Sequence, residues 1–95
     1  MNPVSLSSRV KISKNILFRE MEGEAVLLNA DTGVYFGLDP AGTEIWQRMQ
    51  KEKKLDRILK SILEDYEINQ KICQDDLLRF ASNLQKNGLI EVHEA

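Results

Sequence analysis

The residue types that most often carry catalysis are scarce in this chain of 95 residues. It holds one cysteine, Cys73, and one histidine, His93, with a predicted helix, helix cap and strand between them. A thiol nucleophile needs a base within hydrogen-bond reach, and no second histidine is available. We interpret Cys73 as a small apolar residue at the start of a helix and His93 as an exposed residue near the chain end. The sequence therefore predicts a protein that is not an enzyme.

Metal and phosphate sites are not predicted either. The neighbours Asp75 and Asp76 would point about 100° apart on a helix, so they cannot chelate an ion as a unit. Carboxylates favour the first turn of a helix, where they stabilise the dipole. Contact with basic groups of a bound peptide is the functional alternative for this pair. The glycines fit neither a dinucleotide-binding loop nor a P-loop, and we expect no metal and no cofactor.

The overall composition is that of one soluble domain. Hydrophobic residues make up 42% of the chain and charged residues 29%. Thirteen Lys and Arg against fifteen Asp and Glu give a net charge of −2, without the basic surplus typical of nucleic-acid binders. The N-terminus lacks an apolar targeting segment, and no apolar run is long enough to span a membrane. We therefore predict a cytoplasmic protein that binds neither nucleic acid nor membrane.

The elements that would position any site change character near the middle of the chain. Residues 16–21, 24–29 and 34–38 have the composition of short strands. Short turns at Glu22-Gly23 and Asp31-Thr32-Gly33 predict an antiparallel meander with the second strand in the centre. The third strand would then lie at an edge, where its unpaired backbone groups can pair with another chain. That partner could be a peptide or, by pairing or swapping, a second copy of this chain.

Helical periodicity begins after the third strand. Asp39-Pro40 predicts the start of a helix that runs to about residue 50. An apolar stripe predicts a second helix over residues 55–66, and a third spans about residues 72–86 before a glycine cap. Residues 89–92 form a brief terminal strand. We expect an α+β domain of order β-β-β-α-α-α plus that strand, similar to a winged helix-turn-helix, over residues 10–95, with residues 1–9 as a mobile tail.

A winged-helix shape makes a DNA-binding protein the alternative from another class. In that fold the third helix would enter the major groove. Its first turn carries Asp75 and Asp76, which would oppose phosphates where a helix N-terminus normally attracts them. DNA binding is therefore disfavoured.

The ordered set of motifs resembles the PqqD-like family. The matching residues are Leu27-Leu28-Asn29, the run from Thr32 to Asp39, Gly42-x-x-Ile45-Trp46, and Asp76-x-x-x-Phe80-x-x-x-Leu84-x-x-x-Gly88-Leu89-Ile90. The resemblance covers about residues 14–92. It implies a RiPP precursor peptide recognition element, a small winged-helix-like domain that binds the leader of a ribosomally made precursor peptide without catalysis.

The resemblance also implies where the leader would bind. In that family it adds as a strand beside the third β-strand and packs against the third helix. The candidate peptide-binding residues are Val34, Tyr35, Phe36, Gly37 and Leu38 on the strand and Asp76, Arg79, Phe80, Asn83 and Leu84 on the helix. Two pathways stay open for the partner enzyme. A stand-alone recognition protein of the lasso-peptide type delivers its leader to a cysteine protease, whereas PqqD itself is the peptide chaperone of a radical SAM enzyme in pyrroloquinoline quinone biosynthesis.

Overall fold

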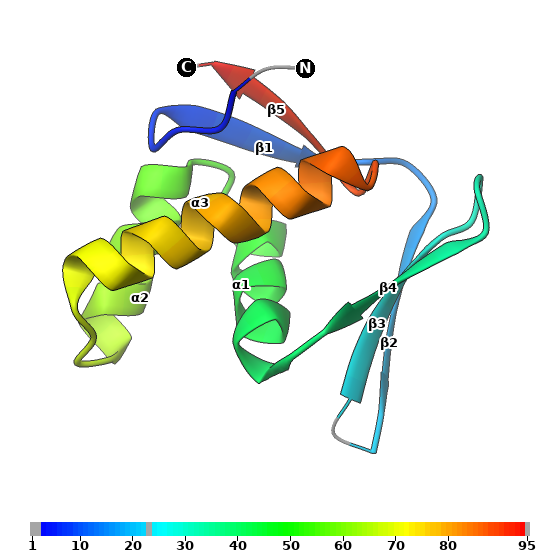
Figure 1. Cartoon of the computed structure of the whole chain (residues 1–95), viewed down its shortest axis with the longest axis horizontal. Coiled ribbons are helices and arrows are strands. Elements are labelled where there is room, and N and C mark those ends of the chain that lie inside the picture. The colour runs from blue at the N-terminus through cyan, green and yellow to red at the C-terminus, as the bar shows by residue number, and fades with distance from the viewer. Residues whose placement is uncertain (1–2, 23, 95) are drawn as a thin grey trace.

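The computed structural model describes residues 3–22 and 24–94 of the chain. In these residues four strands precede three helices, and a fifth strand ends the fold (Figure 1). The elements are β1 Ser8–Ile12, β2 Ile16–Met21, β3 Glu24–Asn29, β4 Val34–Leu38, α1 Pro40–Lys51, α2 Leu55–Asp65, α3 Gln70–Lys86 and β5 Ile90–Glu94. The chain is thus an α+β domain, as its sequence predicts.

The strands β2, β3 and β4 form the predicted antiparallel sheet with β3 in the centre. Leu27 on β3 lies opposite Phe18 on β2 and Phe36 on β4. Alternate residues of β3 are buried, so one face of the sheet packs on the core. Within the described residues β4 pairs with β3 alone, which confirms that β4 is an edge strand.

The turns of this sheet depend on residues in the left-handed region. Gly33 has φ +76°, as the β3–β4 turn predicts, and a glycine adopts this conformation without strain. At the β2–β3 turn Glu22 has φ +53°. Gly23, the other residue of that predicted turn, lies outside the described residues.

A second sheet of two strands was not predicted from the sequence. β1 pairs antiparallel with β5 from the far end of the chain, so that the buried Val10 lies opposite the buried Val92. Ser8 is fully buried and Arg9 forms a bridge with Lys54. β1 therefore begins within the segment 1–9 that the sequence assigns to a mobile tail, and Val4 and Leu6 of that segment also pack against the core. The short β1 strand escapes prediction because its partner is about 80 residues away in the sequence.

A side chain caps the start of α1 and of α3, whereas α2 begins after the extended residue Lys54, which makes no such hydrogen bond. The Asp39 carboxylate accepts a hydrogen bond from the backbone N–H of Gly42 at 2.6 Å, which confirms the predicted start of α1. Asn69 caps α3 through Ile72 N–H, so this helix starts two residues earlier than predicted, and Asp75 and Asp76 lie in its second turn instead of the predicted first. α2 ends at Asp65, and Tyr66 is left exposed at its C-terminus.

One apolar core joins the helices to both sheets. Its largest fully buried side chains include Leu27, Met49, Leu55, Ile58, Leu77, Leu84 and Leu89. Trp46 is also buried, in agreement with its interpretation as a core residue. None of the helices in the described ranges is long and apolar enough to cross a membrane.

Candidate functional site

The open edge of β4 is the first part of the candidate site. Its side chains alternate as the sequence predicts: Phe36 packs against the core, whereas Tyr35 on the opposite face is 67% exposed. Val34 and Gly37 are exposed, and Leu38 is buried next to α1. The strand thus combines an unpaired backbone edge with one side chain row that is accessible on the outer face.

A hollow between α1 and α3 continues from the end of this strand. β4 leads through Asp39 directly into the first turn of α1 (Figure 1). The hollow is lined by Asp39, Ala41, Gly42 and Ile45 from the α1 side and by Asp76, Arg79, Phe80 and Asn83 from α3. Four of the five helix residues predicted for the site therefore lie together beside the end of β4.

The Phe80 side chain of α3 packs closely against α1 at the hollow because Gly42 has no side chain. A Cβ atom at this position would lie 3.1 Å from a ring carbon of Phe80. The half-buried Phe80 ring therefore forms an apolar floor, and the exposed pair Arg79 and Asp76, 3.1 Å apart, lies at the rim. Such an arrangement can take an apolar side chain and pair with a charged one.

Leu84 is the predicted site residue that the structure places elsewhere. Its side chain is fully buried in the core and does not line the hollow. Helical spacing alone put Leu84 on the same face as Phe80, four residues earlier. Phe80 lines the hollow, whereas Leu84 on the next turn of α3 packs in the core. Leu84 is therefore a core residue and not a binding residue.

A smaller apolar pocket adjoins the hollow at the other end of α3. It shares Ala41, Ile45 and Asp76 with the hollow and adds Glu44, Ile62, Tyr66, Ile68 and Cys73. The Tyr66 hydroxyl donates a hydrogen bond of 2.8 Å to Glu44, and this bond raises the pKa of Tyr66. The hollow and this pocket together form a groove that extends beyond the edge of β4. The part of the groove farther from β4 is the more apolar one.

Asn29 is a supporting residue that sequence reasoning did not single out for the site. Its buried side-chain oxygen accepts hydrogen bonds from the backbone N–H groups of Asp31 and Thr32 in the β3–β4 turn. Its amide nitrogen donates to the carbonyl of Gly88 after α3, at 3.5 Å. This side chain thereby fixes the start of β4 relative to the end of α3. An asparagine followed by a turn two residues later is the signal that could have identified it.

The residues considered for catalysis do not assemble into a site. Cys73 is buried on α3, whereas His93 is exposed on β5 and lies 3.9 Å from Glu91. Burial is the main cause that raises the pKa of the Cys73 thiol, and Asp76 adds to it. A raised pKa lowers the fraction of thiolate, which is the reactive form. Within residues 3–22 and 24–94, no three His, Cys, Asp or Glu side chains are placed to hold a metal ion.

The burial of Cys73 and the raised pKa of its thiol can be checked by the rate at which the thiol is alkylated. We expect iodoacetamide at neutral pH to alkylate this thiol more than about tenfold more slowly in the folded protein than in denaturant. Burial limits access and the raised pKa limits the thiolate. Mass spectrometry over time measures both rates, and equal rates would mean that the thiol is accessible.

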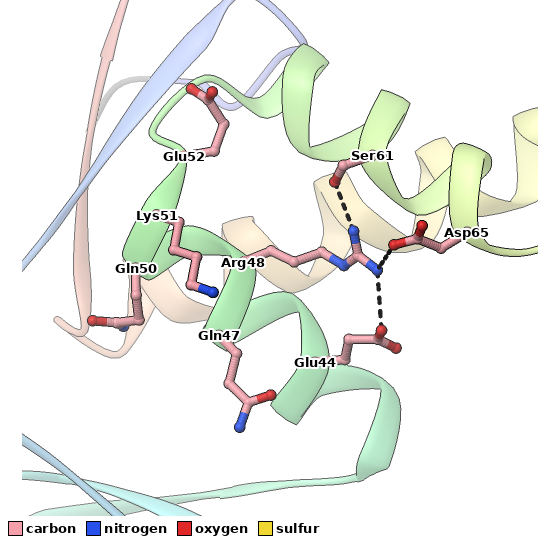
Figure 2. Close-up of a pocket in the computed structure, with 8 residues that line it drawn as sticks. All are labelled: Glu44, Gln47, Arg48, Gln50, Lys51, Glu52, Ser61 and Asp65. Carbon is pink, nitrogen blue, oxygen red and sulfur yellow. Dashed lines mark hydrogen bonds and ion pairs between the residues drawn. The ribbon is translucent and has the colours of Figure 1, made fainter.

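Figure 2 shows a polar pocket on the far side of α1, centred on Arg48. The guanidinium donates to Ser61 and Asp65 on α2, both at 2.8 Å, and to Glu44 on its own helix at 3.1 Å. Burial opposes the charge, but the hydrogen bonds to Asp65 and Glu44 outweigh it and raise the pKa of Arg48. This pocket joins α1 to α2 through the ion pairs of Arg48 with Glu44 and Asp65, while the Arg48 Nε is buried without a hydrogen-bond partner among the described residues.

Comparison with known proteins assigns the chain to a family. Residues 24–90 match the family model described as Coenzyme PQQ synthesis protein D (PqqD). The chain belongs to the PqqD family. No curated protein sequence matches it.

Two solved structures share the fold of this PqqD-family chain. TbiB1 in complex with the TbiA(β) leader peptide is 33% identical, with a TM-score of 0.77 over 85% of this chain and 94% of that one. A lasso peptide synthetase B1 complexed with the leader peptide is 20% identical, with a TM-score of 0.71 over 87% of this chain and 98% of that one. Both of these proteins were therefore solved with a leader peptide bound.

Proposed function

We propose that this PqqD-family protein is a non-catalytic recognition element that binds the leader of a ribosomally made precursor peptide. The observation that carries the proposal is the unpaired edge of β4, which runs directly into the hollow between α1 and α3. An extended peptide can satisfy the edge by β-augmentation and place alternate side chains in the hollow. The leader-peptide complexes of two proteins with this fold also support the proposal that this chain binds a leader peptide.

Affinity and specificity would come from different parts of this site. The backbone of Val34–Leu38 would hydrogen-bond an extended leader with little preference for its sequence. Side chains such as Phe80 and Asn83 would select among leaders, because they line the hollow where peptide side chains arrive. A disordered leader loses conformational entropy when it binds, so a few apolar anchors would dominate the affinity.

The bound leader would keep the precursor at a separate modifying or processing enzyme, and so raise its local concentration there. The likeness to TbiB1 with its leader peptide, together with the fold shared with a lasso peptide synthetase B1, supports a lasso-peptide type of recognition protein, for which the family resemblance implies a cysteine-protease partner. The alternative is a PqqD proper that serves a radical SAM enzyme, which the description of the family model favours. We place either role in the cytoplasm. The order of strands and helices supports a winged-helix-like fold, but Asp75 and Asp76 in the second turn of α3 disfavour DNA as its ligand.

The test is a titration followed by amide chemical shifts. The probes are a synthetic leader of the precursor encoded beside the gene and a short duplex DNA. We expect the leader to shift residues 34–38 and 76–83 and the DNA to shift none at physiological salt. Shifts confined to α2, or no binding of the leader, would refute the proposed site.

The rim charge gives a further prediction. Arg79→Gln should weaken binding of a leader that carries an acidic residue by up to about fivefold, because exposed ion pairs contribute about 0.2–1 kcal/mol. The melting temperature should stay nearly unchanged, since Arg79 is exposed. Lys71→Gln is the matched control: Lys71 also pairs with an aspartate on α3, Asp75 at 3.4 Å, but does not line the hollow. Equal losses in both variants, measured by calorimetry, would contradict a local contact.

A further inference from the structure

The face of the three-stranded sheet that turns away from the core carries apolar side chains. In Figure 1 all three helices lie on one side of this sheet. The register places Leu17, Leu28 and Tyr35 side by side in one row across β2, β3 and β4 on the other side. Leu17 is 45% exposed and Leu28 half-buried. This row of the outer face is thus accessible and apolar up to the open edge of β4.

The next row of the outer face has a gap at the edge strand. Val26 on β3 is half-buried and lies between the exposed Arg19 on β2 and Gly37 on β4. A Cβ atom at Gly37 would meet nothing within 4 Å, and its φ is not in the left-handed region. Neither backbone conformation nor a close neighbour therefore requires a glycine there. Glycine inside a strand often marks a place where another group approaches closely.

An added strand would bring a side chain to this gap. The peptide residue opposite Gly37 would project onto the same face as Gly37, the outer one. Its Cβ atom would lie about 4.5–5.5 Å from the edge position, close enough for a large side chain to lean across the glycine. Aromatic side chains on a neighbouring strand are known to cover glycines in this manner. Val26 below the gap and Tyr35 beside it would provide apolar contacts.

We infer that the leader places a large apolar side chain, best an aromatic one, on the outer face of the sheet across Gly37, against Val26 and Tyr35. This rests on the proposed function and adds a second recognition surface to it. The protein then contacts both sides of the extended leader. Alternate leader residues enter the hollow beside Phe80, and one of the residues between them covers Gly37.

The test uses Gly37→Thr, which fills the gap with a β-branched residue that favours strands. We expect an unchanged or higher melting temperature and an approximately tenfold weaker leader affinity, or about 1.4 kcal/mol. An alanine scan of the same synthetic leader on the wild-type protein should reveal one sensitive outward-facing residue. On Gly37→Thr that sensitivity should disappear, because the two positions are coupled.

Leu17→Ser is the matched control. Leu17 is an exposed apolar residue of the same face but lies two strands, or about 10 Å, from β4. Its substitution should leave leader binding unchanged. Wild-type affinity of Gly37→Thr, or equal losses in both variants, would overturn the inference while leaving the β4 edge site intact. Absence of leader binding by the wild-type protein would refute the proposed function itself.

Discussion

Truncation of Leu84 to alanine is expected to lower the free energy of unfolding by about 2–5 kcal/mol. The side chain is fully buried in the apolar core, so its removal leaves a cavity as well as losing apolar contact. For a domain of this size each kcal/mol corresponds to about 4–8 °C in melting temperature. Urea unfolding measures the change directly, because a small domain of this kind is expected to unfold in one cooperative step.

The same substitution should not affect peptide recognition. At a temperature where Leu84→Ala is still folded, leader affinity should match that of the wild-type protein, since Leu84 does not line the hollow. Leu78→Ala is a suitable control for stability, because Leu78 lies on the same helix but is only half-buried and should cost less. A stable Leu84→Ala variant with weakened binding would place this residue in the groove after all.

The position of Leu84 shows what helical periodicity can and cannot predict about the site. Spacing of three and four residues correctly grouped Asp76, Arg79, Phe80 and Asn83 around one side of α3. The spacing alone could not predict which residues on that side are covered by other elements, because this depends on how α3 packs against α1. The contact of the Phe80 ring with α1 at Gly42 joins two helices, so no periodicity within α3 could reveal it.

The two sheets show the same limit for strands. β2, β3 and β4 could be predicted because short turns connect them, and a glycine with positive φ at residue 33 specifies the second turn. β1 and β5 lack any such local signal: their pairing joins Ser8 to Glu94. In the sequence Asn29 is the last residue of a strand and of a family motif, but its bond to Gly88 links segments that are 59 residues apart.

The largest effect on binding is expected from the leader backbone. In an extended strand successive N–H groups point to opposite sides, so every second one would face β4. Methylation of a facing nitrogen removes a donor and leaves a backbone acceptor of β4 unsatisfied, which costs about 1–3 kcal/mol. Leader peptides with single N-methyl groups should therefore lose roughly fivefold to 150-fold in affinity at alternate residues.

This pattern of period two separates strand addition from the other common mode of peptide recognition. If the leader instead lay as a helix in the groove between α1 and α3, the sensitive residues would recur every three or four positions. The intervening N-methyl peptides serve as internal controls, because their modified nitrogens would point away from β4. Calorimetric titration of the whole series gives the period directly. Because the edge of β4 carries no partner strand in the described residues, we expect a period of two.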